Sequence, residues 1–170
     1  HVRSRRQRQM CIRDSYNKGV VNNIELDAKI LIVDPKKDNF SEYSNANIIT
    51  PNLSELQRTT NIELKNDQSI VDTCNDLIAK HNFDYIVAKK GDQGMIIVGQ
   101  RNFVKHIRAH PVKNADVTGA GDTVIAVLSV VYAKTKDIEL SAKIANTAAA
   151  IAVGKPGTAT VTIDEINNYI

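Results

Sequence analysis

Short apolar runs alternate along the chain with longer stretches whose apolar residues recur every three or four positions. The runs AKILIVD (28–34) and ANIITPN (46–52) are rich in β-branched residues and reach a proline, which predicts two buried strands. The segment YIVAKKGDQGMIIVG (85–99) has the pattern of a strand, a glycine-bounded turn and a second strand. Residues 102–112 alternate like another strand.

Helical spacing follows most of these runs. Residues 68–81 place five apolar side chains on one helical face, namely Ile70, Val71, Cys74, Leu77 and Ile78. Further helices are expected over about 121–134 and 138–153, with a short last one in TIDEINNYI (162–170). LSELQRTT can begin a helix capped by Asn52. The alternation predicts an α/β fold, an open sheet covered by helices.

Polar segments follow four of the predicted elements. They are Asp34, residues 52–55, residues 89–94 and residues 116–122. Ligands of open α/β sheets collect at the carboxyl ends of the strands. We therefore expect these four segments to converge on one edge of the sheet.

Charge and composition exclude several classes of protein. The chain has 170 residues, 42% of them hydrophobic and 24% charged, which suits one globular domain or part of a larger one. Five of the 22 basic residues and one of the 19 acidic residues lie in the first fifteen positions, so the rest carries a net charge of about −1. No nucleic-acid partner is expected.

The basic N-terminus is treated apart from the fold. RSRRQRQMCIRDS shows no apolar periodicity, and MCIRDS resembles the translation of a transposon end used in preparing sequencing libraries. Residues 1–14 are therefore interpreted as a non-native leader, and the alternative is a natural arm that binds RNA or anionic lipid. Cys11 and Cys74 form no metal or disulfide pattern, and no run is long enough to cross a membrane, so a reduced cytoplasmic setting is expected.

The loop KNADVTGAGDT (113–123) carries the clearest chemistry. Gly119, Ala120 and Gly121 let a ligand approach the main chain, and a helix that starts near Ala120 directs its free amides and positive dipole end toward that ligand. A phosphate there, beside Asp122 as a proton acceptor, would suffice for phosphoryl transfer. The plain alternatives are a tight turn and a helix-stabilising acid worth about 0.3–1 kcal/mol. Walker A, HRD and DFG motifs do not occur.

Several motifs resemble those of one enzyme family. DVTGAGD, TPNLSE and KKGDQG resemble the signatures of the ribokinase-like (PfkB) sugar kinases. Within this family, YNKGV, LIVDPKKDNFSEYSNANIITPNLSEL and ANTAAAIAVGKPGTATV are most similar to the kinases of bacterial ADP-heptose synthesis. The similarity covers residues 16 to about 165. It implies the C-terminal part of a three-layer α/β/α sandwich with a mostly parallel sheet, covering residues 15–170.

The resemblance also implies roles for individual residues. Asp122 would be the general base that deprotonates the anomeric hydroxyl of a heptose 7-phosphate, and Gly119, Ala120 and Gly121 would form the anion hole for the γ-phosphate of ATP. In the TPNLSE motif, Asn52, Leu53, Ser54 and Glu55 would face the nucleotide, with Asn52 and Glu55 holding Mg²⁺ largely through water. Thr118 is assigned to the nucleotide as well.

Each of these roles has a plainer alternative. Asn52 and Glu55 have the spacing of a capping box. Lys89, Lys90, Gly91 and Gly94 match the glycine turn beside the nucleotide, or form an ordinary hairpin turn. Many relatives have threonine near this turn, which leaves the roles of the two lysines open and makes Gly91 the better candidate.

The remaining candidates lie on the last two helices and in the loops. Asn146 matches a residue of the adenine pocket, or lies on an exposed helix face, and Gly154 belongs to the loop that closes the pocket or simply ends a helix. Asp116 matches a monovalent-cation site, with K⁺ as the ion, or caps a turn. Asp34 is favoured as a turn residue in Asp-Pro. The default for His81, His106, His110 and Cys74 is a surface or core position.

The same resemblance predicts what lies outside the chain. Kinase domains of this family are about twice as long, and their N-terminal half supplies the sugar pocket and a β lid that forms a homodimer contact. A fused or separate nucleotidyltransferase domain is a further expected partner. We expect this chain alone to expose a strand edge near residues 29–33, to be poorly stable and to be inactive. A pentose, hexose or nucleoside kinase and a non-catalytic nucleotide-binding module remain as alternatives.

Overall fold

Five strands form the centre of the fold. The structure, a computed structural model, describes residues 30–113, 115–157 and 159–169, so the leader at 1–14 lies outside the described residues. The strands are β1 (Ile32–Val33), β2 (Ile48–Ile49), β3 (Tyr85–Lys89), β4 (Met95–Gly99) and β5 (Phe103–Ile107), and they lie side by side in that order. Among the described residues, β1 is therefore an edge strand, as expected.

The sheet is mixed. β1 pairs with β2 and β2 with β3 in parallel, whereas β3, β4 and β5 are antiparallel to one another. The turn η3 (Gly91–Gln93) between β3 and β4 can only reverse the chain, since a parallel connection needs a dozen or more residues. The predicted hairpin is thus confirmed, and it makes the described sheet mixed rather than mostly parallel.

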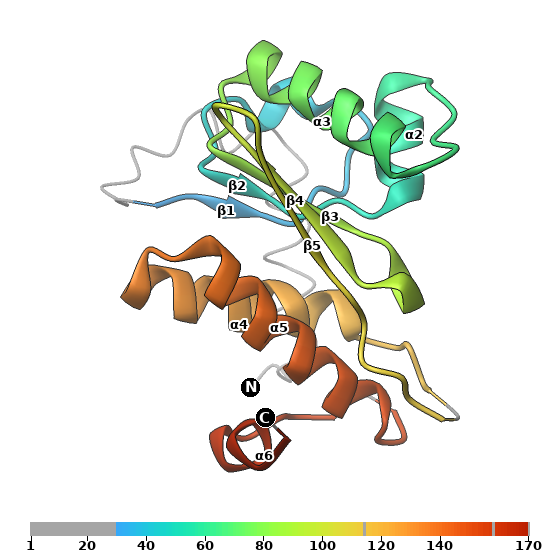
Figure 1. The fold of residues 1–170 in the computed structure, drawn as a ribbon, viewed down its shortest axis with the longest axis vertical. Coiled ribbons are helices and arrows are strands. Elements are labelled where there is room, and N and C mark those ends of the chain that lie inside the picture. The colour runs from blue at the N-terminus through green and yellow to red at the C-terminus, as the bar shows by residue number, and fades with distance from the viewer. Residues whose placement is uncertain (1–29, 114, 158, 170) are drawn as a thin grey trace, which may run out of the picture.

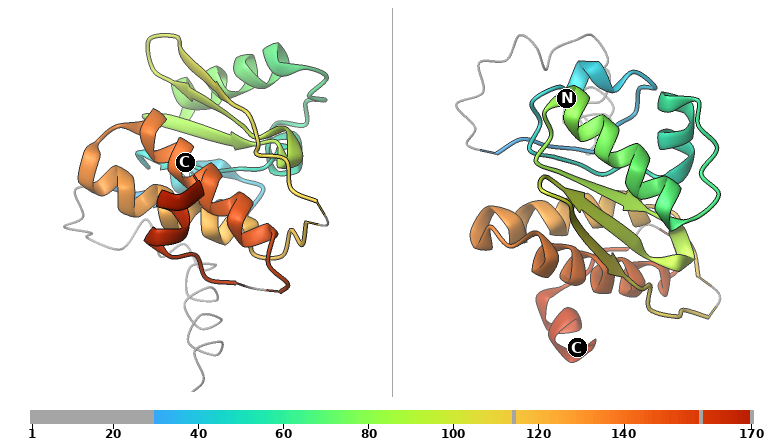
Figure 2. Two further views of the ribbon diagram at one scale, coloured as in Figure 1. Left: turned by 60° about the horizontal axis from the view of Figure 1, so that its bottom comes forward. Right: turned by 45° about the horizontal axis from the view of Figure 1, so that its top comes forward.

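Helices cover both faces of this sheet. Figures 1 and 2 show α2 (Leu53–Thr60) and α3 (Asp67–His81) on one face, and α4 (Ala120–Thr135) and α5 (Ile138–Val153) on the other. The short helix α6 (Ile163–Tyr169) packs against α5. The predicted three-layer α/β/α architecture is confirmed. None of the helices in the described ranges is both long and apolar enough to cross a bilayer.

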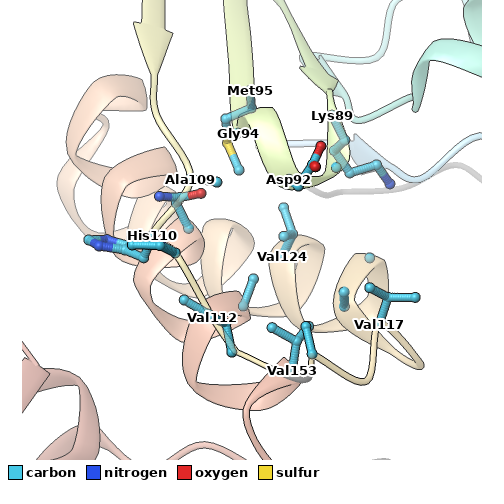
Figure 3. Close-up of a pocket in the computed structure, with 18 of the residues that line it drawn as sticks. Lys89, Asp92, Gly94, Met95, Ala109, His110, Val112, Val117, Val124 and Val153 are labelled. Atoms are coloured by element: carbon cyan, nitrogen blue, oxygen red, sulfur yellow. The ribbon is translucent and has the colours of Figure 1, made fainter.

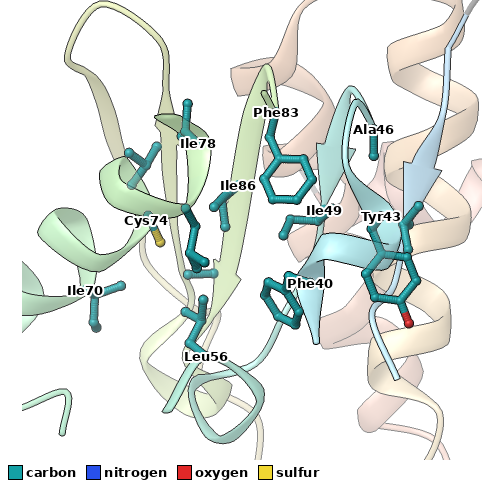
Figure 4. Close-up of a cluster of buried hydrophobic side chains, with 14 of the residues drawn as sticks. Phe40, Tyr43, Ala46, Ile49, Leu56, Ile70, Cys74, Ile78, Phe83 and Ile86 are labelled. Atoms are coloured by element: carbon teal, nitrogen blue, oxygen red, sulfur yellow. The ribbon is translucent and has the colours of Figure 1, made fainter. Parts of the chain in front are cut away.

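Strands that are apolar on both faces hold the layers together. In β3, Ile86 and Ala88 belong to the core under α2 and α3, whereas Val87 belongs to the core under α4 and α5. Figure 4 shows the first core, where Ile86 lies near Cys74 of α3 and Phe83. A fully buried side chain of this size contributes roughly 1.5–3 kcal/mol. Burial also raises the pKa of the Cys74 thiol to about 12, which agrees with its predicted core position.

Helix bounds agree with the periodicity, but the strands are shorter than the apolar runs. Of the described part of the run 28–34, only Ile32 and Val33 form β1. Next to this strand, the Leu31 amide donates to the Asn47 side chain at 2.8 Å. β5 also ends at Ile107, before the end of the predicted run at residue 112. Val117 and Val130 are apolar residues that leave more than 70% of their surface exposed.

Candidate active site

A cavity of about 570 Å³ lies between the η3 turn, the segment after β5, and the helices α4 and α5. Figure 3 shows Lys89, Gly94 and Met95 above it, His110 at one side and Val112 and Val153 below. The lining includes Asn52, Lys89, Gly91, Gly94, Ala120, Gly121 and Asn146, all of them candidates from the sequence. The predicted convergence is therefore confirmed for Asn52, for residues 89, 91, 92 and 94, and for residues 120–121.

The N-terminus of α4 opens at this cavity. Gly119 is the N-cap residue, with φ of 78°, and the first helical bond runs from the Thr123 amide to the Gly119 carbonyl at 3.0 Å. The amides of Gly121 and Asp122 precede that bond, so the helix itself offers them no carbonyl acceptor. Together with the helix dipole, they form a site that favours an anion.

Asp122 lies outside the cavity. It is an exposed residue of the first turn of α4 and does not line the cavity that Ala120 and Gly121 reach. Ala120 and Gly121 thus line the cavity, whereas the next residue of α4 presents its carboxylate to solvent.

Lys89 adds a positive charge beside this helix end. A Cβ atom built on Gly121 would lie 3.5 Å from the Lys89 Nζ, and the Nζ lies 2.6 Å from Asp34 Oδ1. Burial raises the pKa of Asp34, but Lys89 and Lys36 more than offset this and hold it below its ordinary value. The sequence favoured Asp34 as a turn residue. In the structure, its carboxylate forms an ion pair with Lys89. Thr50 donates to the same oxygen at 3.1 Å.

Asn52 and Glu55 form the capping box that was the plainer alternative. The Glu55 amide donates to Asn52 Oδ1 at 2.8 Å, and the Asn52 amide donates to Glu55 Oε2 at 2.7 Å. Asn52 is exposed at the cavity and Glu55 is buried, whereas Leu53 packs against the core and Ser54 is exposed.

The side chains near the cavity limit the way in which a metal ion could be held there. The described ranges contain no group of three His, Cys, Asp or Glu side chains that could enclose a metal. Mg²⁺ that keeps several waters and shares the nucleotide phosphates does not need such a group. Asn52, which lines the cavity, fits water-mediated holding of Mg²⁺. Glu55 is buried, does not line the cavity, and could contribute only from behind Asn52, whose amide its Oε2 accepts.

The glycine turn depends more on Gly94 than on Gly91, the candidate that the sequence favoured. Both have positive φ, but a Cβ on Gly94 would lie 2.0 Å from the Ile107 carbonyl oxygen, whereas one on Gly91 would meet nothing within 4 Å. Lys90 points to Asp67, with 2.5 Å between Nζ and Oδ1, and does not line the cavity. Of the two lysines, Lys89 belongs to the site.

Asp116 joins two loops at the rim. Its Oδ1 accepts the Thr118 amide at 3.0 Å and its Oδ2 accepts the Gly157 amide at 2.9 Å. Hydrogen bonds from Thr118 and from the Gly157 amide lower the pKa of Asp116. The carboxylate thus caps a turn, which was one of the two roles suggested by the sequence, the other being a cation site. Thr118 is exposed and Gly154 ends α5, and neither of them lines the cavity.

The remaining polar and apolar lining includes one residue that the sequence suggested and two that it did not. Asn146 is buried and its Nδ2 donates to the Arg108 carbonyl at 2.9 Å, so the exposed-face alternative was wrong. His110 and Met95 also line the cavity, and neither was a sequence candidate. His110 approaches Thr147 Oγ1 at 3.2 Å and meets the Tyr169 ring edge-on. His81 is buried in the core and His106 is exposed beside Asp67, which agrees with the expected core or surface positions of these histidines.

Comparisons with known proteins support a family assignment. The chain is 39% identical over 142 residues to the bifunctional protein HldE of Rhodopseudomonas palustris (strain BisB18), and 40% identical over 142 residues to that of Nitrobacter hamburgensis. Both alignments cover 84% of this chain and 29% of the relative, so the chain spans less than a third of their length.

Solved structures share the fold. Arabidopsis thaliana ribokinase, complexed with ribose and ATP, matches 92% of this chain and 52% of its own with a TM-score of 0.80 at 23% identity. Phosphofructokinase-2 from Escherichia coli, in complex with potassium, matches 82% of this chain and 46% of its own with a TM-score of 0.74 at 22% identity. The sequence profile of the pfkB family carbohydrate kinases matches residues 16–165. The chain therefore belongs to the pfkB family of carbohydrate kinases.

Proposed function

We propose that the chain is the nucleotide-binding and phosphoryl-transferring part of an ATP-dependent kinase for a heptose 7-phosphate. The observation that carries this proposal is the position of the loop 119–121, with a mainly apolar cavity on one side and the exposed Asp122 outside it. A kinase needs such a division, because the nucleotide and the acceptor must reach the transferred phosphoryl group from opposite sides.

The nucleotide would bind in the cavity. Val112 and Val153 would offer an apolar surface to the adenine ring, and the buried Asn146 would offer a polar group. The phosphates would then extend toward the N-terminus of α4, where the Gly121 and Asp122 amides are directed.

Transfer would take place at the helix end. The Asp122 carboxylate would take the proton of the anomeric hydroxyl while that oxygen forms a bond to the γ-phosphorus. The bond from this phosphorus to the bridging oxygen breaks, and ADP leaves. The amides of the loop would stabilise negative charge on the transferred group. The product would be the sugar 1,7-bisphosphate.

Two ions belong to the proposal. Mg²⁺, held through water by Asn52 and Glu55, would neutralise phosphate charge during transfer. A monovalent cation such as K⁺ is proposed near Asp116. Each carboxylate oxygen of Asp116 accepts one amide and keeps a further lone pair that could ligate the cation.

The choice of sugar rests on the sequence resemblance of residues 16–165 to ADP-heptose kinases. The domain assignment rests on it too, with residues 15–170 as the C-terminal part of one kinase domain. A sugar-binding half, a homodimer contact through a lid and a nucleotidyltransferase partner complete the proposed protein, which would work in the cytoplasm. None of these features depends on the geometry of the cavity.

Replacing Asp122 with Asn in the complete gene product tests the proposal. Turnover of heptose 7-phosphate with ATP should fall by about two orders of magnitude or more, while ATP binding stays within about threefold. Asp76, an exposed carboxylate on α3, gives the matched control Asp76→Asn, which should leave both unchanged. Unchanged turnover in Asp122→Asn would contradict the base. Turnover with a pentose, hexose or nucleoside instead would replace the substrate, and ATP binding without any turnover would favour a non-catalytic module.

A further inference from the structure

A second cavity, of about 220 Å³, lies among α2, α3 and the short helix η2 (Phe40–Tyr43). In Figure 1, α2 and α3 cover the face of the sheet opposite to α4 and α5, the helices that line the cavity of the candidate active site. The two cavities share no lining residue within the described ranges. The proposed reaction therefore does not explain the second cavity.

Thr59 places an unpaired hydroxyl beside this cavity. It lines the cavity, and its Oγ1 is buried without a hydrogen-bond partner in the part of the chain that the structure describes. The next residue, Thr60, shows the usual arrangement in a helix, since its hydroxyl donates to the Leu56 carbonyl at 2.8 Å. Buried polar groups are nearly always paired in native proteins, so the unpaired hydroxyl indicates a partner that the chain itself does not supply.

Two further polar side chains, both on α3, line the same cavity and are almost fully buried. Thr73 is 3% exposed, and its hydroxyl makes no hydrogen bond to another described residue. His81 is 6% exposed, and its Nδ1 lies 3.3 Å from the Ser44 hydroxyl, which leaves Nε2 as the second polar atom of the ring. Burial and the charge of Lys80 lower the pKa of His81, so the ring is neutral at pH 7. The enclosed polar groups are thus neutral and come from two helices.

The size and polarity of the cavity limit the ligand that fits. At about 30 Å³ per water, the cavity has the volume of about seven waters, or of a molecule with about eight non-hydrogen atoms. The buried Phe40 and Leu77 add an apolar surface. A charged ligand would lose its hydration without an enclosed counter-charge, because the charged residues of the lining are exposed. A purely apolar ligand would leave the hydroxyls unpaired.

We propose that this cavity is a second ligand site, which binds an uncharged polyol of about four carbon atoms. The hydroxyls of Thr59 and Thr73 would form hydrogen bonds with those of the polyol, and the C–H groups of the polyol would contact Phe40 and Leu77. The heptose 7-phosphate of the proposed reaction is larger and charged, so this site is not the acceptor site of the kinase. The inference therefore does not depend on the proposed function.

Binding of erythritol, a four-carbon polyol, tests the inference. Saturation-transfer difference NMR of the complete gene product should give a saturable signal with a Kd of about 10 mM or tighter. Thr73→Val replaces the hydroxyl by a methyl group of similar shape and should weaken binding by about tenfold. The matched control is Thr135→Val on α4, an exposed residue whose hydroxyl donates to the Val131 carbonyl, and it should bind erythritol like the wild type.

Thr59→Val gives a second measurement. Because the Thr59 hydroxyl is unpaired in the free protein, its removal should leave the urea midpoint unchanged or raise it, and should still weaken erythritol binding by about fivefold. A lowered midpoint would show that the hydroxyl has a partner in the fold, and would overturn the role of Thr59. If Thr73→Val does not fold, Thr59→Val tests binding in its place.

The remaining outcomes decide between a ligand site and a cavity filled by water. A wild-type protein without saturable erythritol binding, or Thr73→Val with unchanged binding, would overturn the inference. Saturable binding of serine, a zwitterion of similar size, without binding of erythritol would also overturn it, since the ligand would then be charged. The proposed kinase activity stands or fails separately, because it uses none of these residues.

Discussion

The amide of Gly157 donates to Asp116 Oδ2 at 2.9 Å, which joins the loop before α4 to the loop after α5 across 41 positions of sequence. The Asp116 amide in turn donates to the Val153 carbonyl at 2.8 Å. The two bonds tie the loop that carries the proposed anion site to the end of the helix that lines the cavity. The rim of the site thus behaves as one unit.

Removal of the Asp116 side chain should loosen both loops. In Asp116→Ala, the amides of Thr118 and Gly157 lose their acceptor, so their hydrogen exchange should become about tenfold faster or more. Asp164→Ala, at an exposed carboxylate on α6, should leave these amides unchanged. Unchanged exchange in Asp116→Ala would show that the loops are held by other contacts.

Gly94 should tolerate no side chain. Its φ of 92° is strained for other residues, and a Cβ atom would lie 2.0 Å from the Ile107 carbonyl and 2.6 Å from the Ala109 amide nitrogen. Gly94→Ala should therefore lower the free energy of unfolding of the complete gene product by about 3 kcal/mol or more. Urea midpoints measure the change.

Gly91 is the matched control for Gly94. It also has positive φ, of 63°, but a Cβ atom there would meet nothing within 4 Å. Gly91→Ala should cost only the backbone conformation, about 1–2 kcal/mol. Equal losses at the two glycines would mean that the clash at Gly94 is relieved by movement of β5.

Much of the helical layer could be predicted from the sequence. Helical apolar spacing is a local feature, and α3 (Asp67–His81) and α5 (Ile138–Val153) agree with the predicted ranges 68–81 and 138–153 to within a residue. The strands agree less well. How far an apolar run pairs depends on residues that are distant in sequence, such as Asn47, whose side chain accepts a hydrogen bond from the Leu31 amide.

The candidate site was also only partly predictable from the sequence. Gly119–Gly121 and Asn52 belong to short motifs, so the sequence indicated them, although it could not separate the capping box from a metal role. His110 and Met95 belong to none of the motifs. Only the packing of the strands and helices brings them to the cavity, so the sequence did not indicate them. Asp34 and Lys89 are 55 positions apart, and their ion pair depends on the register of β1, β2 and β3.

A methyl group at Gly121 should separate folding from function. The added Cβ would have an ordinary contact of 3.5 Å with the Lys89 Nζ, so Gly121→Ala should fold with stability within about 1 kcal/mol of the wild type. The methyl group would occupy the space where the phosphate is proposed to bind, and kcat/KM for ATP should fall about tenfold or more. The control is Ala126→Gly, on the exposed face of α4. It should lower the free energy of unfolding by about 1 kcal/mol without changing kcat/KM. Normal kinetics in Gly121→Ala would move the phosphate site elsewhere.

Asp34 should make the stability of the protein depend on acid pH. Its pKa is lower in the folded protein than the ordinary value of about 3.8, so folding favours the ionised form. The resulting stability is fully present above about pH 5 and is lost as the pH falls through the lowered pKa. At pH 7, Asp34→Asn leaves the Lys89 charge without its buried partner and should cost about 3 kcal/mol.

The pH series distinguishes charge from shape. The difference in urea midpoint between wild type and Asp34→Asn should be largest near pH 7 and should shrink between about pH 5 and pH 2, as the wild-type carboxyl is protonated. Asp38→Asn is the control, because its pair with Arg58 has both side chains more than half exposed and should contribute less than about 1 kcal/mol. A difference that stayed constant down to pH 2 would mean that Asp34 stabilises the fold through hydrogen bonds and packing. The position of Lys89 would then not depend on the negative charge of Asp34.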